Sequence, residues 1–357
     1  MTVDVLLIGT GSLAKAFCYA IAKANNLTQI KVVILGRSIE KASKISIVAE
    51  TCSAVALSNV SFSPEEVSFE SEADLEKKIA KFAPKIILQM SSPQSPWEFS
   101  DHNNKWSKLV NYAGFGLTVP LQSFITLKVA KIIKNLKLQS LFVNACYPDL
   151  VNPLLKCLGY DVTCGVGNVS ILAAAIRSRS KTYKIADLKI LGHHLHLIKR
   201  TNLPPDYNNP RIWVDNIHEE FTDQCLERIR NVKDQELNQL TGLISAQIII
   251  ALLNTYPTFY NLPGPNGLPG GYPAIVSSSG VVLNLPSTIG EDEAIAWNIE
   301  CSKYDGASID KNGFVRFNDL ARDSLKLNSM KCAEGFYCED IDKVYKEFAN
   351  LRAILRL

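Results

Sequence analysis

The glycine-rich turn at residues 9–14 constrains the fold of this chain more than any other feature. An apolar run over residues 3–8 leads directly into Gly9-Thr10-Gly11-Ser12-Leu13-Ala14. Apolar residues then recur at helical spacing, and a second apolar run follows over residues 30–35. A strand, a glycine-rich turn, a helix and a second strand in this order predict a parallel βαβ unit.

Each position of the turn has a physical role in binding a nucleotide. Gly9 permits the tight turn, Gly11 lets a pyrophosphate approach the backbone, and the small Ala14 lets the helix pack on the strand. The free amides at Ser12 and Leu13 then face the phosphates. We predict a Rossmann domain that binds a dinucleotide through residues 9 and 11–13. The alternative is a nucleotide-free domain whose glycines serve only the turn.

The residues after the second strand distinguish between two cofactors. Proteins that bind NAD usually place Asp or Glu there to accept hydrogen bonds from the ribose hydroxyls. This chain instead has Arg37 and Ser38, with Lys41 one turn later. A guanidinium and a hydroxyl can both donate to a 2′-phosphate. We therefore predict that the cofactor is NADP, with NAD as the alternative. If Arg37 has no role in binding, its side chain simply points into water.

Two later apolar runs predict further parallel strands. Residues 84–90 end in a proline-broken polar loop that begins at Ser91, and residues 140–143 end at Asn144. Because ligands lie beyond the carboxyl ends of the strands in such sheets, Ser91 and Asn144 are expected at the cofactor. The loop over residues 91–108 is expected to cover the nicotinamide half.

Several segments resemble the lactate/malate dehydrogenase family. Asn144 followed by Pro148 and Asp149 resembles the family's Asn-Pro-Val-Asp signature, although Cys146 and Tyr147 intrude. Farther along the chain, two more segments resemble the family's Gly-Glu-His segment and its late antiparallel strands, namely Leu191-Gly192-His193-His194 and Gly270-Gly271-Tyr272-Pro273-Ala274.

The resemblance implies roles for individual residues. Asn144 would donate a hydrogen bond to the substrate oxygen, and His194 would be the general acid–base, since a histidine titrates near neutrality. His193 and His196 leave the register open; in a strand, His194 and His196 would share one face and His193 the other. His-x-His also suits a metal, but no third ligand is evident, so none is expected.

The chain departs from the family where the family carries its orienting Asp and its substrate-clamping Arg. The resemblance aligns these positions with Leu172 and Ala175, and Arg177 follows two places later as the remaining candidate catalytic arginine. Without a bidentate clamp for a carboxylate, a simple lactate or malate substrate is not expected.

The sequence divides into residues 1–152, the Rossmann domain, and residues 153–357, an α+β domain for substrate and oligomerisation. Helices are expected over residues 117–135, 211–230, 237–253 and 341–357, and a strand near residues 281–285. The apolar run over residues 244–253 is about half the length of a membrane span. The resemblance implies a homodimer or homotetramer.

Composition excludes some classes of partner. The net charge is +3, and the basic cluster Arg177, Arg179 and Lys181 is typical of a solvated face, so no nucleic acid partner is expected. The nine cysteines form no CxxC pair, and no secretory signal precedes the first strand, which together favour the cytoplasm. No membrane partner is expected, and the ligand is predicted to be a small molecule.

These features favour an NADP-dependent oxidoreductase acting on a carbonyl/alcohol pair. Two alternatives stay open. One is an opine-type dehydrogenase or an NAD-assisted hydrolase, families that also join a Rossmann domain to a divergent second domain. The other is a non-catalytic NADP(H)-binding sensor or partner subunit, which the missing Asp and Arg would suit.

Overall fold

The computed structural model describes residues 3–24, 29–98, 104–179, 187–198, 203–219, 224–232 and 236–356. Its centre is a six-stranded parallel sheet in the order β3-β2-β1-β4-β5-β6. The strands are β1 (Val5–Ile8), β2 (Ile30–Gly36), β3 (Val60–Glu66), β4 (Ile86–Gln89), β5 (Leu141–Asn144) and β6 (Cys164–Gly165). The order reverses between β1 and β4, where open α/β sheets bind their ligands. The predicted Rossmann sheet is confirmed.

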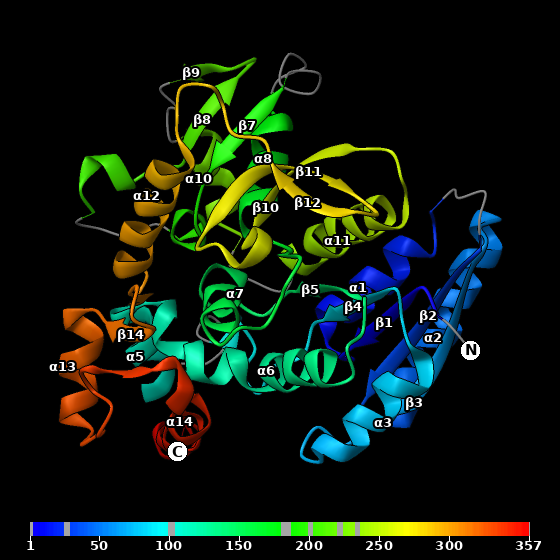
Figure 1. The fold of residues 1–357 in the computed structure, drawn as a ribbon, viewed down its shortest axis with the longest axis horizontal. Helices are drawn as coiled ribbons and strands as arrows, with labels where there is room; N and C mark the ends of the chain where they lie inside the picture. Colours follow the sequence, from blue (N-terminus) through cyan, green and yellow to red (C-terminus); the bar gives the residue numbers. More distant parts are fainter. Residues whose placement is uncertain are drawn as a thin grey trace.

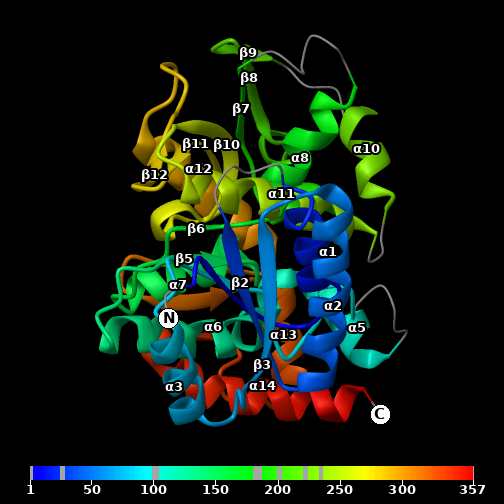
Figure 2. The ribbon, with the colours of Figure 1, turned by 90° about the vertical axis from the view of Figure 1, so that its right-hand side faces the viewer.

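The sheet is buried on both faces because its side chains alternate between two hydrophobic cores. On β1, Leu6 and Ile8 enter one core, and Val5 and Leu7 enter the other. Helices cover the two faces (Figure 2): α1 (Ser12–Ile21), α2 (Ile39–Ala56) and α11 (Leu237–Leu253) on one, and α3 (Glu72–Phe82), α6 (Val119–Asn135), α7 (Pro148–Cys157) and α14 (Ile341–Leu355) on the other. A parallel sheet requires this covering on both sides.

The second half of the chain builds two small antiparallel sheets (Figure 1). Their strands are β7 (Leu188–Leu191), β8 (Arg211–Val214) and β9 (Ile217–Glu219), and β10 (Thr258–Pro263), β11 (Gly271–Ser277) and β12 (Gly280–Leu283). The helices of this part are α8 (Asn168–Arg177), α10 (Gln224–Arg230) and α12 (Glu291–Tyr304). A single bridge between Gly192 and Gly271 connects the two sheets just before the histidine segment.

The helix predicted over residues 211–230 is wrong for residues 211–219, which form β8, a turn and β9. The chain instead turns at Asp215 and Asn216, which have φ values of +50° and +67°. Two consecutive residues with positive φ form the tight turn that suits a right-twisted hairpin, and Asp and Asn tolerate this conformation. Among the described residues of this range, the helical ones are those of α10 (Gln224–Arg230).

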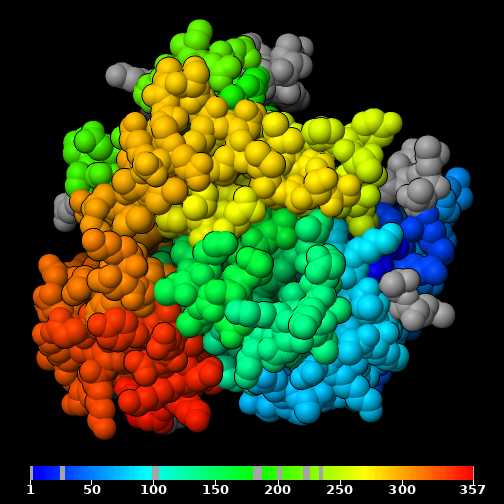
Figure 3. All heavy atoms as spheres, in the orientation of Figure 1, coloured from blue at the N-terminus to red at the C-terminus, as the bar shows by residue number. Residues whose placement is uncertain are grey.

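The C-terminal residues return to the first half of the molecule. A third antiparallel sheet consists of β13 (Ala307–Ile309), β14 (Phe314–Phe317) and β15 (Gly335–Tyr337) and is followed by α14. Strand β14 contacts α13 (Asp319–Leu327), which in turn contacts α5 (Lys105–Ala113). Figure 3 shows these orange and red residues directly beside the green segment. The expected division at residue 152 falls inside α7, and the sheet continues to β6. The chain from β13 onward therefore packs on the Rossmann half.

One helical stretch among the described residues, Phe115–Asn135, is long and apolar enough to cross a membrane by length and composition. It consists of the short 3-10 helix η1 (Phe115–Thr118) and α6. Of its apolar window, 78% is buried inside the protein. A core helix of a folded domain passes the same test.

Candidate active site

A cleft of about 1180 Å³ lies beyond the carboxyl ends of β1, β2, β4 and β5. Its walls include Gly11, Ser12 and Leu13, the loop from Ser91, and His194. The charged side chains that line it, within the part of the chain that the structure describes, are Arg37, Lys41 and Arg230. All three are basic, which favours an anionic ligand.

The glycine-rich turn is built as its sequence predicts. Gly9 has a φ of +131°, and a Cβ there would lie 3.0 Å from the carbonyl oxygen of Met90. At Gly11, nothing lies within 4 Å of an added Cβ. Helix α1 begins at Ser12 without a capping side chain from the described residues, so its first amides can serve a ligand. Gly9 provides the backbone conformation of the turn and does not line the cleft.

The end of β2 carries the two basic residues expected for a 2′-phosphate. Arg37 is exposed, follows the strand directly and lines the cleft together with Lys41. Ser38 has a different position from the one predicted. Its hydroxyl accepts the Lys41 amide at 3.3 Å as the N-cap of α2, and it is not part of the cleft wall.

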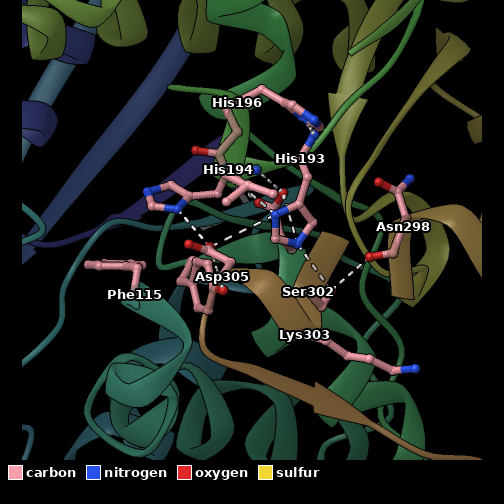
Figure 4. A network of polar contacts seen from close by, with 12 residues as sticks. Phe115, His193, His194, His196, Asn298, Ser302, Lys303 and Asp305 are labelled. Carbon is pink, nitrogen blue, oxygen red and sulfur yellow. Dashed lines mark hydrogen bonds and ion pairs between the residues drawn. The ribbon is translucent and has the colours of Figure 1, made fainter. Parts of the chain in front are cut away.

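His194 forms a hydrogen bond with an aspartate that lies 111 residues away in sequence (Figure 4). Its Nδ1 lies 2.8 Å from Oδ2 of Asp305, whose side chain is fully buried, while the His194 side chain is 12% exposed toward the cleft. Figure 4 shows the second ring nitrogen on the side away from Asp305. A carboxylate on Nδ1 fixes the tautomer and stabilises the imidazolium that forms when Nε2 takes a proton.

Close backbone contacts hold Asp305 in place. Its carbonyl oxygen accepts a hydrogen bond from the Gly116 amide at 2.7 Å. A Cβ on Gly114 would overlap the same carbonyl, so glycine is required there. The end of α12 and the start of η1 therefore approach each other at main-chain distance, which fixes the carboxylate under His194.

A second buried aspartate, Asp149 at the start of α7, orients the backbone of the histidine segment. Its Oδ1 accepts the His194 amide at 2.9 Å, and its Oδ2 accepts the Asn168 side-chain amide. His193, also buried, lies with Nε2 at 3.1 Å from the Ser302 hydroxyl. The two oxygens of the buried Asp149 carboxylate therefore each accept one hydrogen bond, from the histidine segment and from the start of α8.

The three histidines do not lie in a strand, which is the conformation that the sequence analysis considered for them. Residues His194–Leu197 are a 3-10 helix, η2, which His193 caps. The Nδ1 atom of His193 accepts the Leu195 amide at 3.1 Å, and the Nδ1 atom of His196 accepts the His193 amide at 2.9 Å. This local pairing of ring nitrogens with amides favours a turn over a strand.

His196 has a structural position. It is buried and stacks on Trp297 with ring centroids 5.4 Å apart. Burial, together with the nearby His193 and Arg230, lowers the pKa of His196 from 6.5 to about 3, so it is neutral in the folded protein. Among the three histidines, His194 is the one that lines the cleft.

Comparisons by sequence find no relative: no family model matches the chain, and no curated protein does. Comparison by structure does find similar proteins. A malate dehydrogenase from Cryptosporidium parvum has a TM-score of 0.54 at 11% identity, over 85% of this chain and 98% of its own. A lactate dehydrogenase from a Medee basin deep-sea metagenome library has a TM-score of 0.52 at 14% identity, over 85% and 99%.

A third structure, malate dehydrogenase from Plasmodium falciparum in complex with NADH, has a TM-score of 0.50 at 12% identity, over 85% of this chain and 98% of its own. The chain has the fold of the lactate and malate dehydrogenases. The resemblance inferred from loose motifs is therefore confirmed at the level of the fold.

Asn144 does not have the role that the lactate/malate dehydrogenase resemblance implied. It is fully buried at the end of β5 and does not line the cleft. Its Nδ2 donates to the Cys146 carbonyl at 3.1 Å and to Asn152 Oδ1 at 2.8 Å, and its Oδ1 accepts the Cys146 amide at 2.9 Å. The Asn144 side chain is therefore hydrogen-bonded to the inserted Cys146 and stabilises the loop before Pro148.

Arg177 is also misplaced in the sequence-based prediction. It is the last residue of α8 and does not line the cleft. At ten residues, α8 is long enough to carry this end away from the glycines at its start. The structure therefore does not place Arg177, the candidate catalytic arginine, at the cleft. A basic group does reach the cleft from another helix: Arg230 is 6% exposed, and its Nε donates to the His196 carbonyl at 2.7 Å.

The carboxylate beside His194 comes from a different part of the chain than the resemblance implied. Leu172, which the resemblance aligned with the family's Asp, is buried in an apolar core. Asp305 provides the carboxylate instead, from the end of α12. Its sequence signal is only Asp-Gly after a helix, which predicts a turn and contains no information about its partner.

Proposed function

We propose that this chain is an NADP(H)-dependent oxidoreductase that interconverts a carbonyl compound and an alcohol. The observation that carries this proposal is the His194–Asp305 pair, which faces the same cleft as the uncapped start of α1. His194 can move a proton, and the free amides at the start of α1 can bind a pyrophosphate, within a single site.

The cleft residues fit a nicotinamide dinucleotide. Gly11, Ser12 and Leu13 would hold the pyrophosphate, and Arg37 with Lys41 would hold a 2′-phosphate. The bound cofactor would supply the hydride acceptor or donor. A malate dehydrogenase of the same fold is described in complex with NADH, which supports a nicotinamide cofactor, and the basic pair after β2 favours NADP over NAD.

The proton chemistry falls to His194. Its Nε2 would give a proton to the carbonyl oxygen in reduction and take it from the hydroxyl in oxidation. Asp305 would stabilise the charged ring during the oxidation. Because Ala175 and Arg177 provide no bidentate clamp, we propose a substrate other than lactate or malate, with Arg230 as the basic group on its side of the cleft.

The first test is a fluorescence titration of the purified protein with NADPH and, separately, with NADH. We expect NADPH to bind at least tenfold more tightly, as about 1.4 kcal/mol of extra contact to the 2′-phosphate would produce. If neither dinucleotide binds, the oxidoreductase proposal fails. If NADH binds as tightly as NADPH, the role of Arg37 fails and the reaction class stands.

A second candidate is a non-catalytic NADP(H)-binding protein, favoured by the engagement of Asn144 within its own loop. A screen of carbonyl compounds with bound NADPH separates the two, since only the oxidoreductase consumes the cofactor. A homodimer or homotetramer and a cytoplasmic location complete the proposal.

A further inference from the structure

Tyr147 occupies an unusual backbone position at the edge of the cleft. It is the residue before α7 and has φ +46° and ψ +59°, a left-handed conformation that non-glycine residues rarely adopt. Its carbonyl oxygen nevertheless accepts the amides of Leu150 and Val151, at 3.2 and 3.0 Å, so the first turn of the helix holds it. Tyr147 therefore stands at the start of α7 and in the wall of the same cleft as His194.

The hydroxyl of Tyr147 and the ring of His194 share one acceptor atom. Tyr147 Oη donates to Asp305 Oδ2 at 2.9 Å, and His194 Nδ1 lies 2.8 Å from that same oxygen. The Tyr147 ring is also edge-on to His194, with centroids 5.5 Å apart, and to Phe115, at 4.8 Å. Tyr147 is 4% exposed and Asp305 is fully buried, so water does not screen the three groups.

The other groups around this oxygen come from several elements. His193 Nδ1 lies 3.8 Å from Asp305 Oδ2, and Asp149 lies on the other side of His193, with 4.0 Å between its Oδ1 and Nε2. The titratable groups that face Asp305 or its neighbours are His193, His194 and His196 of the η2 segment, Asp149 of α7, Cys301 of α12 and Tyr147 itself.

We infer that Tyr147 is a positioning residue that controls the proton affinity of His194 through the shared Asp305 oxygen. A hydroxyl that donates to a carboxylate stabilises the negative charge and reduces the pull of that charge on the imidazolium. The same hydrogen bond keeps the carboxylate in line with Nδ1. This inference rests on the proposed role of His194 as the group that moves the proton.

The test is the Tyr147→Phe variant of the full chain, which keeps the ring and removes one oxygen. The titration of the His194 ring is followed by NMR, with assignment by loss of the signal in His194→Asn. We expect the midpoint to rise by about one pH unit, a roughly tenfold higher proton affinity, as expected for the loss of one hydrogen bond to a charged group. In the Asp305→Asn background, the same change should have no effect.

Tyr207→Phe is the matched control, because the Tyr207 ring stacks on Trp297, which also stacks on His196, whereas the hydroxyl that donates to Asp305 Oδ2 is that of Tyr147. It should leave the His194 midpoint unchanged. An unchanged midpoint in Tyr147→Phe would overturn the inference and reduce Tyr147 to a packing residue. NADPH affinity is measured in parallel, so that a failure of the cofactor proposal is distinguished from a failure of this one.

A measurement on the unmodified protein covers the case in which Tyr147→Phe does not fold. The Tyr147 hydroxyl proton should give a slowly exchanging NMR resonance with a cross-peak to the His194 Nδ1 proton. A hydroxyl that exchanges at the rate of an exposed tyrosine would overturn the shared-oxygen arrangement.

Discussion

Glu98 and Arg352 form a bidentate ion pair that connects the loop after β4 to the C-terminal helix α14. The Arg352 Nε and Nη2 atoms donate to the Glu98 carboxylate at distances of 2.8–3.1 Å, and Glu98 is 4% exposed. Arg356 adds a further contact at 3.1 Å. The next residue back, Trp97, donates its indole N–H to Asn238, which donates to the Ser12 hydroxyl. The C-terminal helix, the loop and the start of α1 are thus linked.

Removing this pair should destabilise the fold. We expect Arg352→Ala to lower the free energy of unfolding by about 1–3 kcal/mol, since a buried carboxylate keeps only the weaker contact to Arg356. Urea unfolding measures the change. Arg322→Ala is the control, because its ion pair with Asp319 lies on the surface. Equal, small effects of both substitutions would show that the Glu98 pair contributes no more than a surface contact.

The Asp305→Asn substitution should separate catalysis from binding. An amide on Nδ1 cannot stabilise the imidazolium, so we expect turnover of any accepted carbonyl substrate to fall by roughly 10²–10⁴-fold while NADPH affinity stays within a factor of about two. His194→Asn should cost as much, and the double variant should cost no more than either single one. Steady-state kinetics give the comparison. His218→Asn, on the exposed strand β9, should have no effect; turnover that survives in Asp305→Asn would contradict the assignment.

Arg37 should determine cofactor choice. We expect Arg37→Gln to weaken NADPH binding by about 10–100-fold, the loss of a charge-assisted hydrogen bond, and to leave NADH binding unchanged. The two fluorescence titrations measure this directly. Lys44→Gln serves as a control, since Lys44 pairs with Glu40 on the surface of α2 and is outside the cleft. Parallel losses for both dinucleotides would mean that Arg37 does not contact the 2′-phosphate.

His196 should make stability depend on pH on the acid side. The pKa of His196 is lowered from 6.5 to about 3 in the folded protein, so the unfolded chain binds this proton first. Stability is therefore retained above pH 6.5 and decreases as the pH falls toward 3, by at most about 1.4 kcal/mol per pH unit from this group.

The His196→Asn variant tests this pH dependence, because it keeps an acceptor for the His193 amide and cannot titrate. This variant should be less stable than the wild type at pH 7, because it loses the packing of the His196 ring on Trp297. The difference should narrow between pH 6 and pH 4 in urea unfolding. A difference that stays constant over this range would place the acid sensitivity in other groups.

The local elements of the first half could be predicted because their signals are local. The apolar runs of β1, β2 and β4 and the uncapped start of α1 are set by residues adjacent in sequence. The same holds for α11, whose bounds match the predicted 237–253. The basic side chain of Arg37 follows β2 directly, so its position in the cleft required no information about distant parts of the chain.

The pairing of His194 with Asp305 could be found only in the tertiary structure. His194 and Asp305 are 111 residues apart, and their contact depends on the backbone approach of Gly114 and Gly116 to the end of α12. The failed predictions have the same origin. The Asn144 side chain forms its hydrogen bonds within its own loop, and Arg177 lies at the far end of α8. The sequence determined the sheet and its phosphate-facing turn, because these depend on neighbours in the chain. Only packing decided which carboxylate lies beneath His194, because no short-range rule links two side chains that meet across separate elements.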